Sequence, residues 1–157
     1  MRIGKQFIRN YVTEQLKVFQ NYMDVKRVDV LVNGKLLGFA CKDEWEGGIF
    51  YMWKEGGDYA RDMRSACQKL RKYVREWVRD VTEAIYARGL EHEDCLYYDR
   101  MAINNVLDEE LEGYSTANEN IVRNSYELDY YDMVNDVIPA QYCYRTQMQA
   151  PAVSDLL

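Results

Sequence analysis

The only histidine of the chain lies in a short segment that gathers several groups capable of chemistry, Glu91-His92-Glu93-Asp94-Cys95. An imidazole beside a thiol could form a nucleophilic pair, and with carboxylates it could hold a metal ion. A zinc or iron site needs further ligands, however, and the sequence supplies no second cluster of them. We therefore expect His92 to be structural or solvent-exposed, and we predict no catalytic residue, no cofactor and no metal.

Other catalytic patterns are incomplete. The glycines occur in pairs and not in a phosphate-binding loop followed by Lys-Ser or Lys-Thr, which argues against a P-loop nucleotide hydrolase. Carboxylates at helix-face spacing, Asp58 with Asp62 and Glu109 with Glu112, could share a proton or a metal, but nothing beside them identifies a substrate. We interpret them as capping and salt-bridge residues and predict that the protein is not an enzyme.

Charge is divided unevenly along the chain. Its 157 residues include 26 acidic and 20 basic side chains, a formal net charge of −6. Residues 1–89 hold 17 basic and 12 acidic side chains, whereas residues 90–157 hold 3 and 14. Opposed halves indicate an electrostatic partner for one of them, or contact between them within one chain or in a homodimer. A solvated acidic surface that only keeps the protein soluble is the alternative.

The basic half predicts a basic stripe on a long helix. On a helical wheel of about 100° per residue, six cations fall within an arc of roughly 100°, away from the apolar positions. They are Arg61, Arg64, Arg71, Lys72, Arg75 and Arg79. The basic stripe would be about 27 Å long, enough to meet several phosphates. A nucleic-acid-binding module is therefore one hypothesis, and a solvated helix face is its alternative.

The acidic half is also rich in tyrosine, a residue that gives large contact areas at interfaces. Carboxylates at helical spacing could mimic phosphates in front of a basic, nucleic-acid-handling protein. The predicted partner-binding residues are Asp108, Glu109, Glu110, Glu112, Glu127, Asp129, Tyr130, Tyr131 and Asp132. Small acidic inhibitors from phages and mobile elements, including anti-CRISPR and anti-restriction proteins, are similar in composition. A non-enzymatic inhibitor of this kind is the first hypothesis; tyrosines in the core and acids that only solvate helices are the alternative.

The positions of these residues depend on the elements that periodicity predicts. Apolar residues at three- and four-residue steps predict a helix over residues 5–23. Arg27–Val32 and Lys35–Lys42 flank Asn33-Gly34, which accepts the positive φ angles of a type I′ turn, so we predict a hairpin. Residues 49–54 are rich in aromatic and branched side chains and predict a third strand of an antiparallel meander.

A long helix is predicted after this strand. Gly56-Gly57 closes the strand, Asp58 can cap the helix, and Gly89 can end it after Arg88. Its apolar residues alternate steps of four and three, which predicts a seam that packs on another helix. These residues are Met63, Cys67, Leu70, Val74, Trp77, Val81 and Ala84.

The acidic half predicts two further helices, over 95–111 and 117–136, with Pro139 ending the second. Residues 142–146 alternate as an edge strand would, and 147–157 would form a loose tail. The expected fold is α+β and mostly helical: an N-terminal helix, a three-stranded antiparallel meander, a long amphipathic helix and two acidic helices. We expect a single domain, 1–157, with a basic portion (1–89) and an acidic, tyrosine-rich portion (90–157).

The order helix, three antiparallel strands, helix over residues 5–88 resembles that of the double-stranded RNA-binding domain, and the resemblance implies recognition of RNA by shape. The family's second helix opens with lysines, whereas this chain has acids in the segment Gly56-Gly57-Asp58-Tyr59-Ala60-Arg61-Asp62-Met63. No functional residue is therefore transferred from that family.

The N-terminal residues lack the apolar core of a signal peptide, and no run approaches the roughly 18 apolar residues of a membrane span. The cysteines, Cys41, Cys67, Cys95 and Cys143, are too widely spaced for a zinc pattern or a compact disulfide framework. We therefore expect reduced thiols, a cytoplasmic protein and no membrane partner.

Overall fold

The structure is a computed structural model that describes residues 1–21, 27–43, 47–54, 56–118, 121, 123 and 125–137. The elements are α1 (Lys5–Glu14), β1 (Leu16–Asn21), β2 (Arg27–Val32), β3 (Lys35–Lys42), β4 (Ile49–Trp53), β5 (Gly56–Ala60), α2 (Met63–Ala87), α3 (Leu96–Glu110), β6 (Ser125–Leu128) and α5 (Met133–Asp136). The chain is α+β, but its layout differs from the predicted one. The edge strand predicted over 142–146 and the tail over 147–157 lie outside the described residues.

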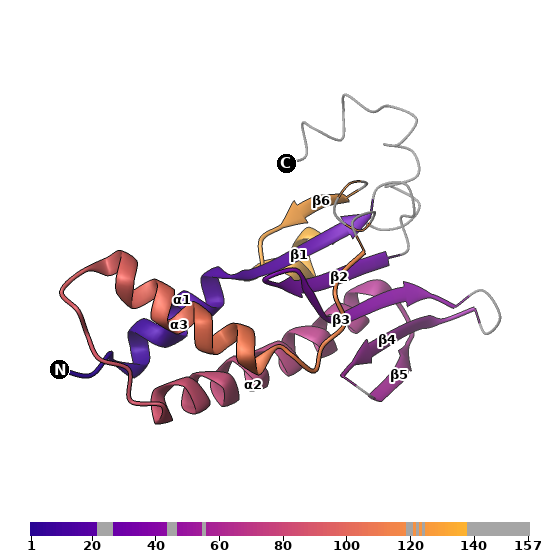
Figure 1. Cartoon of the computed structure of the whole chain (residues 1–157). Coiled ribbons are helices and arrows are strands. Elements are labelled where there is room, and N and C mark those ends of the chain that lie inside the picture. The colour runs from indigo at the N-terminus through magenta and orange to yellow at the C-terminus, as the bar shows by residue number, and fades with distance from the viewer. Residues whose placement is uncertain are drawn as a thin grey trace.

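The named strands form one antiparallel sheet of six in the order β5-β4-β3-β2-β1-β6 (Figure 1). The hairpin of β2 and β3 is confirmed, because Asn33 (φ 49°) and Gly34 (φ 76°) both take the positive φ angles of a type I′ turn. The three-stranded meander is wrong, since β1, β5 and β6 extend it on both sides. The helix-meander-helix layout shared with the double-stranded RNA-binding domain is therefore not present.

The first helix is shorter than predicted. It ends at Glu14, and Leu16–Asn21 forms β1 instead. Leu16 fits both a helical step and, with Val18, the alternation of a strand. The strand forms because β2 pairs with it on one side and β6 on the other, which buries Leu16, Val18 and Gln20 on one face. The hydroxyl of Tyr126 on β6 donates to Oε1 of the buried Gln20 at 3.3 Å.

Gly56–Ala60 is an edge strand and not a turn followed by a helix. The ring of Phe50 on β4 lies against Gly57, where an added Cβ would be 2.6 Å from Cζ of that ring. Gly57 therefore allows the ring of Phe50 to lie close to the backbone of β5. The long helix α2 begins at Met63, and Asp62 replaces the predicted Asp58 as N-cap, since its Oδ1 accepts a hydrogen bond from Ser65 N at 2.8 Å.

The predicted helix over 117–136 is also wrong. Ser125–Leu128 pairs with β1 as strand β6, and within residues 125–137 only Met133–Asp136 is helical. Tyr126 and Leu128 are buried around the exposed Glu127, which is the alternation of a strand, but Tyr126 also fits the helical spacing of the residues that follow. The helix predicted over 95–111 is confirmed as α3 to within one residue at each end.

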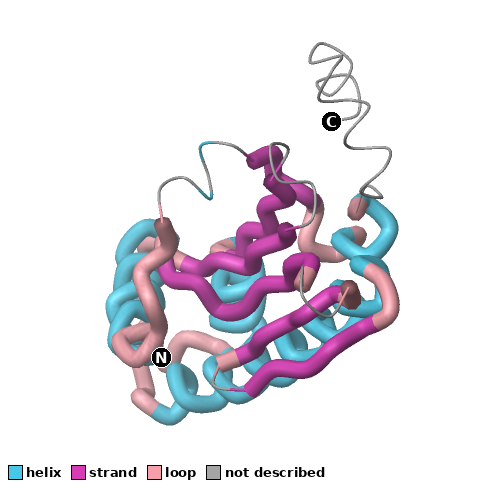
Figure 2. Tube along the Cα trace, turned by 90° about the vertical axis from the view of Figure 1, so that its right-hand side faces the viewer, coloured by secondary structure: helices cyan, strands magenta, loops and turns pink. Residues whose placement is uncertain are grey.

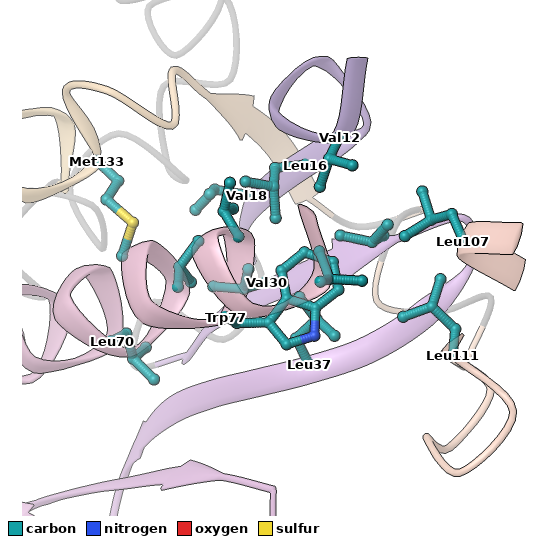
Figure 3. Close-up of a cluster of buried hydrophobic side chains, with 14 of the residues drawn as sticks. Val12, Leu16, Val18, Val30, Leu37, Leu70, Trp77, Leu107, Leu111 and Met133 are labelled. Carbon is teal, nitrogen blue, oxygen red and sulfur yellow. The ribbon is translucent and has the colours of Figure 1, made fainter. Parts of the chain in front are cut away.

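Helix α2 lies along one face of the sheet, against β3, β4 and β5, and α1, α3 and α5 pack on it (Figure 1; Figure 2). Its buried side is wider than the predicted seam, since Ala66, Val78 and Ile85 are also buried. That width is typical of a helix that covers a sheet and its neighbours rather than one partner helix. Leu70 and Trp77 point into the buried core, to which strands of the sheet and α3 also contribute side chains (Figure 3).

Gly38 on β3 offers a test of this packing. An added Cβ would lie 2.6 Å from Cε3 of Trp53 and 2.7 Å from the carbonyl oxygen of Met52. Trp53 also stacks on Tyr73 of α2, with ring centroids 6.1 Å apart. We expect Gly38→Ala to lower the free energy of unfolding by about 1–3 kcal/mol, measured by urea denaturation. Gly113→Ala, with nothing within 4 Å of the added Cβ, is the control, and equal losses would contradict the packing described.

Candidate functional site

A cleft of about 300 Å³ lies between α1, α2 and the turn that joins β6 to α5. We call it the arginine cleft. Its lining residues are Gln6, Arg9, Asn10, Thr13, Arg71, Arg75, Val78, Tyr130 and Tyr131.

Core packing determines which sides of the two helices face the arginine cleft. The lining residues of each helix recur at three- and four-residue steps, so they share one side of it. The adjoining sides carry Ile8 and Val12 on α1 and Leu70 and Val74 on α2, which are all buried. Because burial fixes the rotation of both helices, their polar flanks are held facing the same cleft.

Arg9 of α1 lines the arginine cleft together with Arg71 and Arg75 of α2. No carboxylate of the described residues lies within 4.0 Å of any of the three guanidinium groups. Other arginines do have such partners: Nη1 of Arg88 is 2.7 Å from Oε2 of Glu109. Three like charges without a counter-ion repel one another, so binding of an anion would be favoured here.

Two tyrosines close one end of the arginine cleft. Cζ of Arg71 lies 5.9 Å from the ring centroid of Tyr130. Burial raises the pKa of Tyr130, while the charges of Arg71, Arg75 and Arg9 act in the opposite direction, so its hydroxyl lies in the field of all three. The neighbouring ring of Tyr131 is 60% exposed and meets Tyr130 edge-on, at 5.3 Å between centroids.

The wall formed by α1 supplies neutral hydrogen-bonding groups. Nε2 of Gln6 donates to Oδ1 of Asn10 at 2.8 Å, and the Thr13 hydroxyl donates to the carbonyl oxygen of Arg9 at 2.8 Å. Amides and hydroxyls beside guanidinium groups are the usual set of contacts to phosphate oxygens.

Five residues of the predicted basic stripe lie on α2, and Arg71 and Arg75 line the arginine cleft. Arg61 precedes the helix, with its Nε 3.5 Å from Oδ2 of the N-cap Asp62. The basic stripe therefore begins at Arg64 and not at Arg61.

The two ends of the basic stripe have neighbours. Arg64 donates to Oδ1 of Asn135 at 3.2 Å, and Arg79 lies 3.4 Å from Oδ1 of Asp80. Between them Lys72 is exposed, and none of the described carboxylates lies within 4.0 Å of it.

The predicted partner-binding residues fall into two groups on different elements. Asp108, Glu109 and Glu110 end α3 and Glu112 follows it, whereas Glu127, Asp129, Tyr130, Tyr131 and Asp132 belong to β6 and the turn after it. Some have partners within the chain: Glu109 pairs with Arg88, and Oε1 of Glu127 is 3.4 Å from Nζ of Lys17. Tyr130 and Tyr131 meet the arginines instead.

His92 lies in the turn before α3. Its Nδ1 is 2.5 Å from Oδ2 of Asp99, and its Nε2 is 3.1 Å from Oδ1 of Asp94. The buried Asp99 also accepts a hydrogen bond from the backbone N–H of Glu93 at 3.0 Å. Both ring nitrogens thus have carboxylate neighbours that hold the turn. In the part of the chain that the structure describes, no group of three or more His, Cys, Asp or Glu side chains could hold a metal ion.

A larger hollow of about 720 Å³ lies between β3, β4 and residues 113–115. Leu36, Phe39, Met52 and Tyr114 give it mainly apolar walls, and Lys54 is the charged residue among the described ones in its lining. The described lining of this hollow lacks a set of converging polar groups. The arginine cleft is therefore the stronger candidate for a specific site.

Sequence reasoning did not identify the α1 side of the arginine cleft. Gln6, Arg9, Asn10 and Thr13 form a polar flank with helical spacing, which was a readable feature of the sequence. The helix is predicted from the apolar positions of that segment alone, so its polar flank is not among the predicted site residues. That this flank faces α2 depends on tertiary packing and is not encoded in its own period.

The contacts of Asp99 with the turn around His92 lead to a prediction about pH. The hydrogen bond that Asp99 accepts from Glu93 N–H, and further its contact with His92, keep the pKa of Asp99 below its ordinary value. Such a carboxyl stabilises the fold above its unfolded-state pKa of about 3.9, and that stabilisation is lost as pH falls through the folded-state pKa. We therefore expect Asp99→Asn to destabilise the protein at pH 7, and the difference from wild type to shrink below about pH 4.

Thermal unfolding followed by circular dichroism between pH 2 and pH 7 measures that difference. Asp94→Asn is the control, because the Asp94 side chain is 97% exposed. A difference between Asp99→Asn and wild type that stays constant with pH would contradict this account of Asp99.

Comparison with protein-family models, with curated proteins and with solved structures finds no match to this chain. No helix among the described residues combines the length and the apolar character needed to span a membrane.

Proposed function

We propose that this protein is a non-enzymatic module that binds nucleic acid, with Arg9, Arg71 and Arg75 contacting phosphates in the arginine cleft. The observation that carries the proposal is that all three arginines line one cleft and that no described carboxylate lies within 4.0 Å of their guanidinium groups. The chain has 26 acidic side chains, so a shortage of acids does not explain why these three guanidinium groups have no described carboxylate within 4.0 Å.

Phosphate is the anion that suits this arrangement. A guanidinium group presents a planar fork of N–H donors that can bind two phosphate oxygens at once, and charge-assisted bonds are roughly twice as strong as neutral ones. The amide of Asn10 and the hydroxyl of Tyr130 line the same cleft and can add neutral hydrogen bonds. Together they could hold a phosphate whose charge the three arginines neutralise.

The basic stripe favours a polymer over a single phosphate. It continues past the arginine cleft to Arg64 on one side and Arg79 on the other, a length of about 22 Å along α2. Lys72 is exposed between them. The pair of Arg79 with Asp80 is itself exposed, so it contributes little and can be exchanged for a phosphate contact.

Replacing Arg71 and Arg75 together by Gln should weaken nucleic-acid binding at least about tenfold near 100 mM salt, because two phosphate contacts are lost. The slope of log affinity against log salt should become shallower by about 1.4 for single strands or about 1.8 for duplex. Fluorescence anisotropy with labelled 20-nucleotide strands and 20-base-pair duplexes measures both quantities.

The matched control replaces Lys42 and Lys54 by Gln. It removes the same charge from exposed residues outside the arginine cleft, and should leave the salt dependence near that of wild type. If both double variants weaken binding alike, or if the wild-type protein binds neither probe at low salt, the proposal is wrong.

A second candidate function is docking of the acidic half on a basic, nucleic-acid-handling protein, as an anti-CRISPR or anti-restriction inhibitor would do. A group of exposed apolar side chains at the start of α3 favours it: Leu96, Tyr97, Tyr98 and Met101, which are 42–66% exposed. Glu93 and Asp94 precede them, with Cys95 between. Exposed tyrosine and methionine beside carboxylates are suited to a protein surface of opposite charge.

Docking of this kind predicts that the triple variant Glu109→Lys, Glu110→Lys and Glu112→Lys captures its partner several-fold less well than wild type, because favourable charge contacts become repulsive. A pull-down from cell lysate with the intact protein as bait, at two salt concentrations, measures the capture. The control reverses three acids of the basic half, Asp58, Glu76 and Asp80, for the same change in net charge. Undiminished capture by the first variant would contradict docking through α3.

A further inference from the structure

We propose, building on the nucleic-acid binding proposed above, that the arginine cleft takes a single strand and that one unpaired base stacks on the ring of Tyr131. The proposal rests on where that ring lies, how it is held, and which charges surround it.

Tyr131 presents an aromatic surface directly beside the guanidinium groups. Its side chain is 60% exposed although it lines the same cleft as Arg71 and Arg75. Tyr130 supports it from within, with the ring planes at 62° to each other. A phosphate on the arginines would therefore place its own nucleotide within reach of an exposed aromatic ring, and stacking of bases on such rings is the usual basis of single-strand binding.

The ring is presented by a turn that hydrogen bonds hold in place. Oδ1 of Asp129 accepts a hydrogen bond from Tyr131 N at 2.9 Å, and Asp132 N donates to the carbonyl oxygen of Asp129 at 3.1 Å. Directly after the turn, Met133 is buried in the core beside α2 (Figure 3). Because the backbone is already ordered, stacking on Tyr131 would cost little further conformational entropy.

The charges around Tyr131 indicate which part of a nucleotide faces it. Asp129, Asp132 and Asp136 follow one another through the turn and into α5, and burial together with the charges of Asp132 and Asp129 raises the pKa of Asp136. Negative charge on this side repels phosphates, whereas the arginines on the helix side attract them. A neutral base is therefore the part of the nucleotide that can approach Tyr131.

The dimensions of the arginine cleft favour a single strand over a duplex. A volume of about 300 Å³ is at the lower end of the range for small-molecule sites, so it has room for part of one nucleotide. A duplex could place a phosphate at the mouth of the cleft, but its bases are stacked on each other and paired. Only an unpaired base can turn its face toward Tyr131.

Fluorescence anisotropy with the full chain tests the proposal. The probes are a labelled 20-nucleotide thymidine strand, a uridine strand of the same length and a 20-base-pair DNA duplex. We expect the tighter of the two single strands to bind at least about tenfold more strongly than the duplex, and comparison of the two strands distinguishes DNA from RNA. Tyr131→Ala should weaken that binding by about 5- to 150-fold, the range for loss of one stacked base, and leave duplex binding unchanged.

Two further variants separate stacking from other effects. Tyr131→Phe keeps the ring and should bind the single strand as wild type does. Tyr97→Ala removes an equally exposed tyrosine from α3, outside the arginine cleft, and should change neither affinity. Equal binding of single strand and duplex, or unchanged single-strand binding by Tyr131→Ala, would overturn the inference. If the Arg71 and Arg75 double variant still loses affinity in that case, the proposed function survives; binding of no probe would overturn both.

Discussion

The packing of α2 on the sheet is the contact on which the rest of the molecule depends. Leu70, Val74 and Trp77 are buried in the core, and each large apolar side chain buried there contributes roughly 1.5–3 kcal/mol. That burial fixes the rotation of α2, so Arg71 and Arg75 are held on the flank that meets α1. The arginine cleft is therefore built mainly on two helices whose orientation the core determines, which gives a binding site more precise geometry than loops alone would.

Strand pairing, and not charge, joins the basic and acidic halves of the chain. β1 from the first half pairs with β6 from the second, and Val18 and Leu128 face each other in the core. The ion pairs Lys17–Glu127 and Arg88–Glu109 also link the halves, but all four side chains are about half exposed and such pairs contribute little. The opposed charges therefore need not neutralise each other within the chain, and no described carboxylate lies within 4.0 Å of the guanidinium groups of the cleft.

The parts of the fold that could be predicted depend on local sequence. Asn33-Gly34 determines the β2–β3 turn, and a single apolar period defines α3. The apolar spacing fits both a helix and a strand over Leu16–Asn21 and over Ser125–Leu128. Pairing with strands distant in sequence decides in favour of strands. The same limit applies to the site: the helical wheel finds Arg71 and Arg75, but not the helix that faces them. Two residue sets proposed for rival surfaces, arginines and tyrosines, meet in one cleft because tertiary packing brings them together.

An acidic chain can still bind a polyanion if the contacts are short in range. At physiological salt, charges farther apart than about 8 Å are largely screened, so the net charge of −6 opposes a nucleic acid mainly at long distance. Steering toward the site would be weak, and affinity would depend on groups that touch the ligand. Guanidinium contacts and a stacked base both act at contact distance. A base stacked on Tyr131 adds a contact that does not depend on charge, and only a strand with an unpaired base can make it.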